Sequence, residues 1–139
     1  CGNIGIDVET IEIRSQVFLK EWFTEHELSL MQAFSMNEYP DLACSSTAMW
    51  SVKEAVSKAL GLGGSIIKDI EIRNISNHKA TVELHGRALW FWSRLSNPNI
   101  HIRLRLEKEE VQAVAIILCD DISKPMFSFS QALPAVLLA

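Results

Sequence analysis

The sequence predicts a single α+β domain in which a small antiparallel sheet packs against a long helix. Apolar and polar residues alternate in several short stretches, as in strands with one buried face, while Leu42 to Leu60 runs without glycine or proline, as in a long helix. The elements follow one another as strand, three helices, hairpin, helix and hairpin, which is not the alternating order of a parallel fold. The 139 residues, 48% of them hydrophobic, suffice for one core and not for two.

The first element is predicted to be a strand that begins near residue 4. Three apolar residues alternate there with three others, which is the period of a strand with one face buried and the other turned outward. The apolar set is Ile4, Ile6 and Val8, and the alternating set is Gly5, Asp7 and Glu9. We therefore expect the apolar set on the core side of the strand and both carboxylates together on its other side.

Two helices are predicted between this strand and the long helix. The first is expected from about Ile11 to Trp22. The second is expected to begin at Thr24, because Thr24 and Glu27 have the spacing of a capping box. An apolar stripe that includes Leu28 and Met31 follows this signal and supports the helix.

The long helix is expected to begin at Leu42, after a break that contains Pro40, and to end at the glycine cluster of residues 61–64. Three- and four-residue steps along the helix define its core side. The residues expected on the core side are Ala48, Met49, Val52, Val56 and Ala59, and those expected on another face are Trp50, Glu54, Ser57 and Lys58.

The second half of the sequence predicts two hairpins with a short helix between them. Each hairpin is indicated by two alternating stretches around a polar or charged turn. The first pair of strands is expected at residues 69–73 and 81–85, the helix around Leu89 to Trp92, and the second pair at residues 100–107 and 111–118.

We expect the domain to span residues 1–127 and residues 128–139 to form a C-terminal tail. Pro134 interrupts an otherwise apolar stretch there, which favours a tail packed on a partner or a neighbouring domain over a further helix. The first residue is Cys1 rather than methionine, and the strand pattern already begins at about residue 3. We therefore expect the chain to be a piece of a longer protein.

Charge and composition argue against several classes of function. The chain has 13 Lys and Arg against 17 Asp and Glu, and this mildly acidic balance predicts no nucleic-acid partner. Three cysteines without C-x-x-C spacing indicate neither a disulfide framework nor a zinc site, which fits a cytoplasmic location. No apolar run approaches the roughly 18 residues that cross a bilayer, so we expect no membrane partner.

Three carboxylates are candidates for a metal site. Asp7 and Glu9 share one strand face, and Glu54 lies on the long helix beside Lys53 and Lys58. The three carboxylates would meet if that helix packs on the strand. Hard oxygen ligands suit Mg²⁺, which completes its shell with water and phosphate oxygens. The lysines would then neutralise phosphate charge.

Each part of this set also has an ordinary structural interpretation. Glu54 and Lys58 are four residues apart with the acid first, which is the arrangement of a surface ion pair on a helix. Asp7 and Glu9 would equally suit the solvated side of an edge strand. The spacing of these residues leaves both interpretations open.

Three segments carry a longer pattern. They read G-I-D-V-E at residues 5–9, F-T-E-H-E-L at 23–28 and W-S-V-K-E-A-V-S-K-A-L-G at 50–61. In this order and at this separation they resemble the successive signatures of the phosphopantetheinyl transferase superfamily. The resemblance covers roughly residues 4–73 and continues weakly through the last hairpin. It implies an α+β enzyme that moves the 4′-phosphopantetheine group from coenzyme A to a serine of an acyl or peptidyl carrier protein.

The resemblance also implies a role for each matching residue. The implied catalytic residues are Glu54 and Lys58, the implied coenzyme A contacts are Lys53, Lys58 and Gly61, and the implied Mg²⁺ ligands are Asp7, Glu9 and Glu54. The lysines would contact phosphate or assist removal of the serine proton. The serine oxygen would attack the β-phosphate of coenzyme A, and 3′,5′-ADP would leave.

The sequence departs from the family pattern on one strand. Single-domain members, which resemble holo-acyl-carrier-protein synthase, carry a Ser-x-Ser/Thr-His element there, whereas residues 100–106 contain Arg103 and Arg105 instead. In two-lobed members that element lies upstream of the G-I-D strand, and Trp50-Ser51 resembles their helix motif, so the chain resembles a C-terminal lobe. Arg103 and Arg105 would either contact coenzyme A phosphates or line a solvated strand face.

Family geometry implies a coenzyme A cleft between two such units, so we expect association with a second copy or lobe. The alternative function is a degenerate, non-catalytic module of the same fold that binds a carrier protein or completes an assembly. The sequence leaves open which carrier protein and pathway are served and how many copies assemble.

Overall fold

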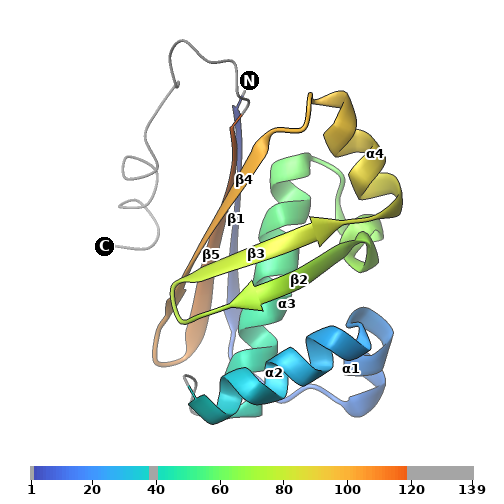
Figure 1. Cartoon of the computed structure of the whole chain (residues 1–139). Helices are drawn as coiled ribbons and strands as arrows, with labels where there is room; N and C mark the ends of the chain where they lie inside the picture. The colour runs from blue at the N-terminus through green and yellow to red at the C-terminus, as the bar shows by residue number, and fades with distance from the viewer. Residues whose placement is uncertain (1, 38–40, 119–139) are drawn as a thin grey trace.

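The computed structural model describes residues 2–37 and 41–118. The described residues form one five-stranded sheet in the order β1-β5-β4-β3-β2, and every pair of neighbouring strands is antiparallel. The long helix α3 lies along one face of this sheet, as Figure 1 shows. The predicted fold class, a small antiparallel sheet on a long helix, is confirmed.

The helices and strands follow one another along the chain in the order that the sequence predicts, with the short 3-10 helix η1 added after α3. Their bounds are β1 Gly2–Thr10, α1 Gln16–Trp22, α2 Glu25–Asn37, α3 Leu42–Leu60, the 3-10 helix η1 Gly64–Asp69, β2 Ile70–Ile75, β3 Lys79–Leu84, α4 Gly86–Arg94, β4 Asn99–Leu106 and β5 Glu110–Leu118.

Helix α3 has the bounds that the sequence predicts, because both of its ends carry strong local signals. The Asp41 side chain accepts a hydrogen bond from the Cys44 backbone N–H at 2.9 Å and caps the start. Gly61 ends the helix with φ at 74°, a left-handed conformation that glycine adopts without a side-chain penalty. All five residues expected on its core side are buried. Ser57, expected on another face, is also buried, and its hydroxyl donates to the Gly63 carbonyl oxygen at 2.6 Å.

Helix α2 begins with the predicted capping box. The Thr24 N–H donates to Glu27 Oε1 at 2.9 Å, and the Glu27 N–H donates to Thr24 Oγ1 at 3.1 Å. Helix α1 is shorter than predicted, because the Ile11 N–H still donates to the Glu109 carbonyl oxygen at 2.9 Å and continues the sheet. The helix starts only after Ser15, whose hydroxyl accepts a hydrogen bond from the Phe18 N–H.

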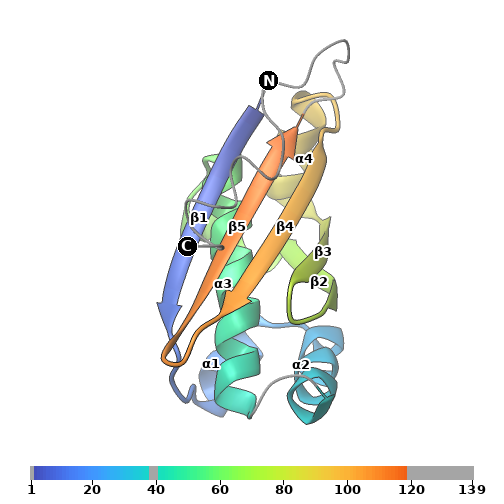
Figure 2. The ribbon, with the colours of Figure 1, turned by 90° about the vertical axis from the view of Figure 1, so that its left-hand side faces the viewer.

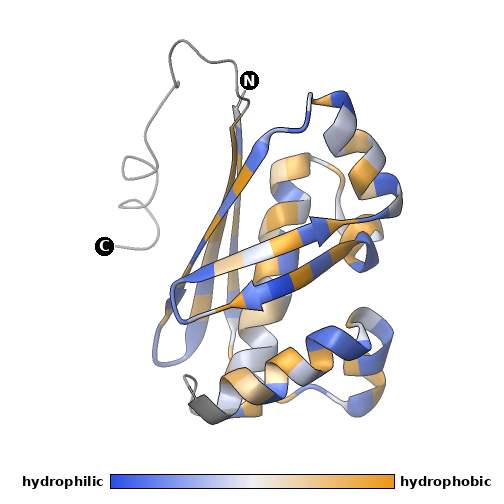
Figure 3. Ribbon diagram, in the orientation of Figure 1, coloured by the Kyte–Doolittle hydropathy of each residue, from blue (hydrophilic) through white to orange (hydrophobic). Residues whose placement is uncertain are grey.

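The sheet divides into a continuously paired part and a diverging part. Strands β1, β5 and β4 pair along their whole lengths, whereas β3 and β4 share only two residue pairs, Lys79 with Arg103 and Ala80 with Ile102. Beyond these pairs, β3 and β4 separate, and α4 connects their far ends (Figure 1). Figure 3 shows the strands alternating between hydrophilic and hydrophobic residues, while α3 carries mainly hydrophobic or neutral ones.

The orientation predicted for β1 is wrong. Ile4, Ile6 and Val8 are 44%, 42% and 49% exposed, whereas Gly5 and Asp7 are buried against α3. The reason is close packing: a Cβ on Gly5 would lie 1.9 Å from the Ala55 carbonyl oxygen, so the strand approaches the helix with its glycine side. The alternation marked a strand correctly but assigned its two faces the wrong way round.

No helix within residues 2–37 and 41–118 is long and apolar enough to cross a membrane. The expected C-terminal tail, residues 128–139, lies outside the described residues.

Candidate functional site

The buried carboxylate of Asp7 is the centre of the candidate site. Its Oδ1 accepts a hydrogen bond from Lys58 Nζ at 2.8 Å, and its Oδ2 accepts one from Ser51 Oγ at 3.0 Å. Both donors lie on α3, and Lys58 Nζ also donates to the Ile6 carbonyl oxygen at 3.1 Å. Asp7 is only 5% exposed, whereas the Lys58 side chain is 50% exposed, so the cluster extends from the strand–helix contact to the surface.

Helical geometry explains why these side chains meet. Ser51, Glu54 and Lys58 are spaced by three and four residues, which places them on one side of α3 over about two turns. Strand β1 packs along that side with Gly5, Asp7 and Glu9 turned toward the helix. The carboxylates from β1 and the side chains from α3 therefore face one another across the strand–helix contact.

Electrostatics show that the site holds closely spaced negative charge. Burial, the charge of Asp7 and a hydrogen bond to Asp7 raise the pKa of Glu9 to about 7, against a smaller opposing effect of Arg14. Burial and the charge of Asp7 also raise the pKa of Glu54 above its usual value, although Lys58 opposes the rise. The hydrogen bond to Asp7 raises the pKa of Lys58, so this side chain stays protonated at neutral pH.

This donor set suits a hard divalent cation. Three carboxylates share the site with Lys58, and a cation would offset both causes of the raised pKa values of Glu9 and Glu54, which are burial first and the charge of Asp7 second. The structure thus brings Asp7, Glu9, Glu54 and Lys58 together as the sequence predicts. It differs from the sequence-based expectation in that Asp7 is buried.

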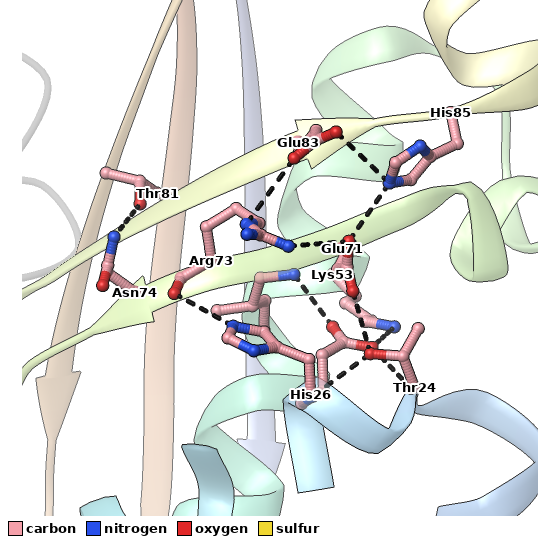
Figure 4. Close-up of polar contacts among 11 residues, drawn as sticks. Thr24, His26, Lys53, Glu71, Arg73, Asn74, Thr81, Glu83 and His85 are labelled. Atoms are coloured by element: carbon pink, nitrogen blue, oxygen red, sulfur yellow. Dashed lines mark hydrogen bonds and ion pairs between the residues drawn. The ribbon is translucent and has the colours of Figure 1, made fainter. Parts of the chain in front are cut away.

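Lys53 lies elsewhere, although the sequence predicts it as a coenzyme A contact. Its side chain is 1% exposed, and its Nζ donates to the Trp22 carbonyl oxygen and to Glu27 Oε1, both at 2.8 Å. The other oxygen of Glu27 accepts the Ile72 backbone N–H at 2.9 Å. Figure 4 shows Lys53 among the polar residues between β2 and the start of α2. Lys53 therefore joins α1, α2 and α3 inside the fold.

Gly61 and the arginines of β4 take up different positions relative to the cluster. Gly61 lies three residues beyond Lys58, at the exposed end of α3. Arg103 pairs across the sheet with Val114, which pairs in turn with Ile6, so all three point away from α3. Arg105 forms an ion pair with Glu107 at 2.6 Å. Neither arginine joins the Asp7 cluster of its own chain.

The sequence interpretation missed two partners. In the sequence, Ser51 stands out only as part of the helix motif, yet its hydroxyl donates a hydrogen bond to Asp7 Oδ2. Its position seven residues before Lys58 indicates that the two side chains share one face of the helix. Glu27 was assigned only to the capping box, yet it also neutralises Lys53. No local pattern indicates this second role, because the two residues come from different helices.

A second polar cluster lies on the β2–β3 hairpin. Glu71 accepts hydrogen bonds from Thr24, Arg73 and His85, and ligand atoms of Glu71, Glu83 and His85 lie within 4.8 Å of one another. Arg73 also pairs with Glu83 at 3.6 Å. Figure 4 shows these side chains linked to one another on the same side of the hairpin. The Arg73 guanidinium forms ion pairs with both carboxylates, so a structural role accounts for the cluster.

Comparisons with known proteins give matches over most of the chain. Residues 3–117 match the model of the 4′-phosphopantetheinyl transferase superfamily. A holo-[acyl-carrier-protein] synthase of Magnetococcus marinus is 35% identical over 132 residues, which cover 84% of this chain and 93% of that enzyme. The fatty acid synthase subunit alpha of Saccharomyces cerevisiae is 32% identical over 122 residues, which cover 83% of this chain but only 6% of that subunit.

A solved structure resembles the chain in three dimensions. The acyl carrier protein synthase of Plasmodium yoelii with ADP bound superposes with a TM-score of 0.69 at 26% identity, covering 86% of this chain and 96% of that one. The matched region contains β1 and α3, which supply the Asp7 cluster. Because the family model spans most of the sequence, the chain belongs to the 4′-phosphopantetheinyl transferase superfamily.

Proposed function

We propose that the chain transfers the 4′-phosphopantetheine group of coenzyme A to a serine of an acyl or peptidyl carrier protein, with Mg²⁺ as the cofactor. The observation that carries the proposal is the Asp7 cluster, in which carboxylates of β1 and α3 meet Lys58. The chain spans about 6% of the fatty acid synthase subunit that it matches, so the activity is proposed for this domain. The ADP bound by the Plasmodium yoelii synthase supports a site for an adenosine diphosphate group, which coenzyme A contains.

Asp7, Glu9 and Glu54 would hold the Mg²⁺ ion. Their carboxylate oxygens are the ligands that Mg²⁺ prefers, and the ion would stabilise the charged forms of Glu9 and Glu54, which burial and the charge of Asp7 disfavour. When bound, Mg²⁺ supplies a positive charge that polarises the diphosphate. Ser51 holds Asp7 in place through a buried hydrogen bond.

Lys58 and Glu54 would act on the reacting groups. The half-exposed ammonium of Lys58 would bind a phosphate oxygen and stabilise the charge that develops during transfer. Glu54, placed beside the reacting groups as a Mg²⁺ ligand, would accept the serine proton with its other carboxylate oxygen. The serine oxygen then bonds to the β-phosphorus, the bond from that phosphorus to the bridging oxygen breaks, and 3′,5′-ADP leaves. Gly61, beside the end of α3, would border coenzyme A.

We further infer that a second copy or lobe completes the coenzyme A cleft. Arg103 and Arg105 point away from the Asp7 cluster of their own chain, so they could reach a coenzyme A phosphate only at the site of another copy. Lys53 is not included among the coenzyme A contacts, because its ammonium is buried against Glu27.

Transfer is tested by mass spectrometry of an apo carrier protein incubated with the chain, coenzyme A and Mg²⁺. We expect the carrier to gain the mass of one phosphopantetheine group with the native chain and with Glu109→Gln, an exposed carboxylate outside the cluster. Asp7→Asn and Glu54→Gln should abolish the gain and keep the circular dichroism spectrum, since both variants preserve side-chain shape.

Together with a binding measurement, this assay distinguishes the transferase from the alternative function, a non-catalytic module of the same fold. Coenzyme A binding by calorimetry without any mass gain of the carrier would identify a non-catalytic module. Equal transfer by Asp7→Asn and the native chain would contradict the assigned site.

A further inference from the structure

Helix α4 carries a row of exposed arginine and tryptophan side chains. Arg87, Trp90 and Arg94 are all exposed, and their spacing of three and four residues places them on one side of the helix. We call these three residues the α4 row. The opposite side carries Ala88, which is 0% exposed where α4 packs against η1 and α3. Figure 1 and Figure 2 both show α4 at the end of the molecule that lies far from α1 and α2, so the α4 row belongs to that end of the surface.

Trp90 is exposed to an extent that the other tryptophans are not. Trp22, Trp50 and Trp92 are partly buried, whereas Trp90 is 61% exposed. The guanidinium of Arg94 lies over the Trp90 ring, with Cζ 4.7 Å from the ring centroid. This cation–π contact holds both side chains in one arrangement, which lowers the entropy that they lose when a partner binds. The α4 row is thus partly ordered for binding.

The two arginines of the α4 row form no ion pair with a carboxylate in the described part of the chain. Arg73 and Arg105, by contrast, are paired with glutamates. The Asp69 carboxylate accepts the Arg87 backbone N–H at 3.0 Å and forms no ion pair with the Arg87 guanidinium. In a chain with a formal net charge of −4, these two guanidinium groups mark a local positive surface.

This combination of side chains favours a protein partner with negative charge. Tryptophan and arginine are enriched among the residues that dominate binding energy at protein interfaces, because a tryptophan ring buries a large apolar area and a guanidinium forms paired hydrogen bonds with a carboxylate. A nucleic acid fits less well, since two arginines in a net acidic chain neutralise few phosphates. An anionic membrane is also less suitable, because such surfaces are bound by clusters of about four to eight basic residues.

We propose that the α4 row binds an acidic segment of a partner protein. Arg87 and Arg94 are seven residues apart, which corresponds to about 10 Å along the helix at about 1.5 Å per residue. Two carboxylates of the partner at this separation pair with the arginines, and an apolar side chain between them covers Trp90. The proposal concerns a surface formed by α4 alone and does not depend on the transferase activity.

Titration of the isotope-labelled full chain, followed by NMR, tests this contact. The probe is an otherwise uncharged helical peptide with glutamates at positions i and i+7 and leucines at i+3 and i+4, which reproduces the carboxylate spacing. A matched peptide carries lysine in place of both glutamates. Each tryptophan gives its own indole N–H signal. Trp22 serves as the internal control, because it lies on α1 and packs against Trp50 with the ring centroids 5.6 Å apart.

We expect the glutamate peptide to shift the indole signal of Trp90 and the backbone signals of α4, and to leave the indole signal of Trp22 unchanged. Trp90→Ala and Arg94→Glu should each weaken binding about tenfold or more. Lys108→Glu makes the same change of charge at an exposed position after β4 and should alter the affinity less than about threefold. Circular dichroism spectra of the three variants should match that of the native chain, because each variant replaces an exposed side chain.

Three outcomes of this titration would overturn the proposal. They are equal affinity for the lysine peptide, an equal loss of affinity in Arg94→Glu and Lys108→Glu, and the absence of a shift of the Trp90 indole signal. Vesicles that contain phosphatidylserine and a single-stranded DNA are titrated in parallel. Binding of either through Trp90, without binding of the glutamate peptide, would replace the acidic protein segment by a membrane or a nucleic acid as the partner.

Discussion

Gly5 of β1 lies so close to Ala55 of α3 that a Cβ added to the glycine would be 1.9 Å from the Ala55 carbonyl oxygen and 2.4 Å from the Ala59 backbone nitrogen. Both neighbours are backbone atoms in the middle of the longest helix, so neither can move aside without bending the helix. This contact sets the distance between the strand that carries Asp7 and the helix that carries Ser51.

Gly5→Ala should therefore destabilise the fold strongly. We expect the free energy of unfolding in urea to fall by about 3 kcal/mol or more, because the added methyl group must push β1 away from α3. Gly64→Ala is the matched control, since a Cβ at Gly64 meets no atom within 4 Å. Equal stability of the two variants would show that the strand and helix are less closely packed than described.

Lys53→Met should destabilise the protein by about 3–5 kcal/mol, because it leaves Glu27 charged and buried without its cation. Urea unfolding measures the loss, and Lys68→Met is the control, because the ion pair of Lys68 with Glu21 is exposed and worth about 1 kcal/mol or less. Affinity for coenzyme A, measured on the folded fraction by calorimetry, should stay unchanged. A selective loss of coenzyme A affinity with native stability would restore Lys53 as a phosphate contact.

Ser51→Ala should weaken Mg²⁺ binding by about tenfold or more, because Asp7 loses the hydrogen bond that orients its carboxylate. Calorimetric titration with Mg²⁺ in the presence of coenzyme A checks this. Ser46→Ala is the control: Ser46 is also buried on α3, but its hydroxyl donates to Ala43 of the same helix. The assignment of Asp7 as a metal ligand fails if both variants bind Mg²⁺ as the native chain does.

Glu71→Gln should reduce the sensitivity of the fold to acid. Burial alone would raise the pKa of Glu71, but hydrogen bonds from His85, Thr24 and Arg73 outweigh burial and hold the pKa below 4.5. A carboxylate with a lowered pKa stabilises the folded state above the unfolded pKa and loses that contribution as pH falls through the folded pKa.

The native chain should thus lose stability more steeply than Glu71→Gln below about pH 4.5, while the variant should be the less stable of the two at pH 7. Thermal unfolding followed across this range measures both effects. Glu25→Gln, at an exposed position on α2, provides the comparison for a carboxylate outside the cluster. Parallel pH profiles for the native chain and Glu71→Gln would exclude the assigned hydrogen bonds as a source of acid sensitivity.

Local signals made several elements predictable. The bounds of α3 follow from Asp41 at its start and Gly61 at its end, and the start of α2 follows from the reciprocal hydrogen bonds of Thr24 and Glu27. These signals act between residues at most a few positions apart, so they are present in the sequence itself. The membership of Asp7 and Lys58 in one site was also predictable, but only through the family resemblance, since spacing alone allowed a surface ion pair.

By itself, the sequence determined that residues 4–9 alternate as a strand and that residues 42–60 form a helix with one apolar side. Tertiary structure alone decided which side of β1 meets that helix, because a period of two leaves the choice of face open. Gly5 determines which face of β1 packs on α3, because only a residue without a side chain can lie this close to the helix backbone. Ile4 or Ile6 in that position would clash with the helix. The same choice buried Asp7 beside Ser51 and Lys58, and it turned three apolar residues toward the other side of the sheet.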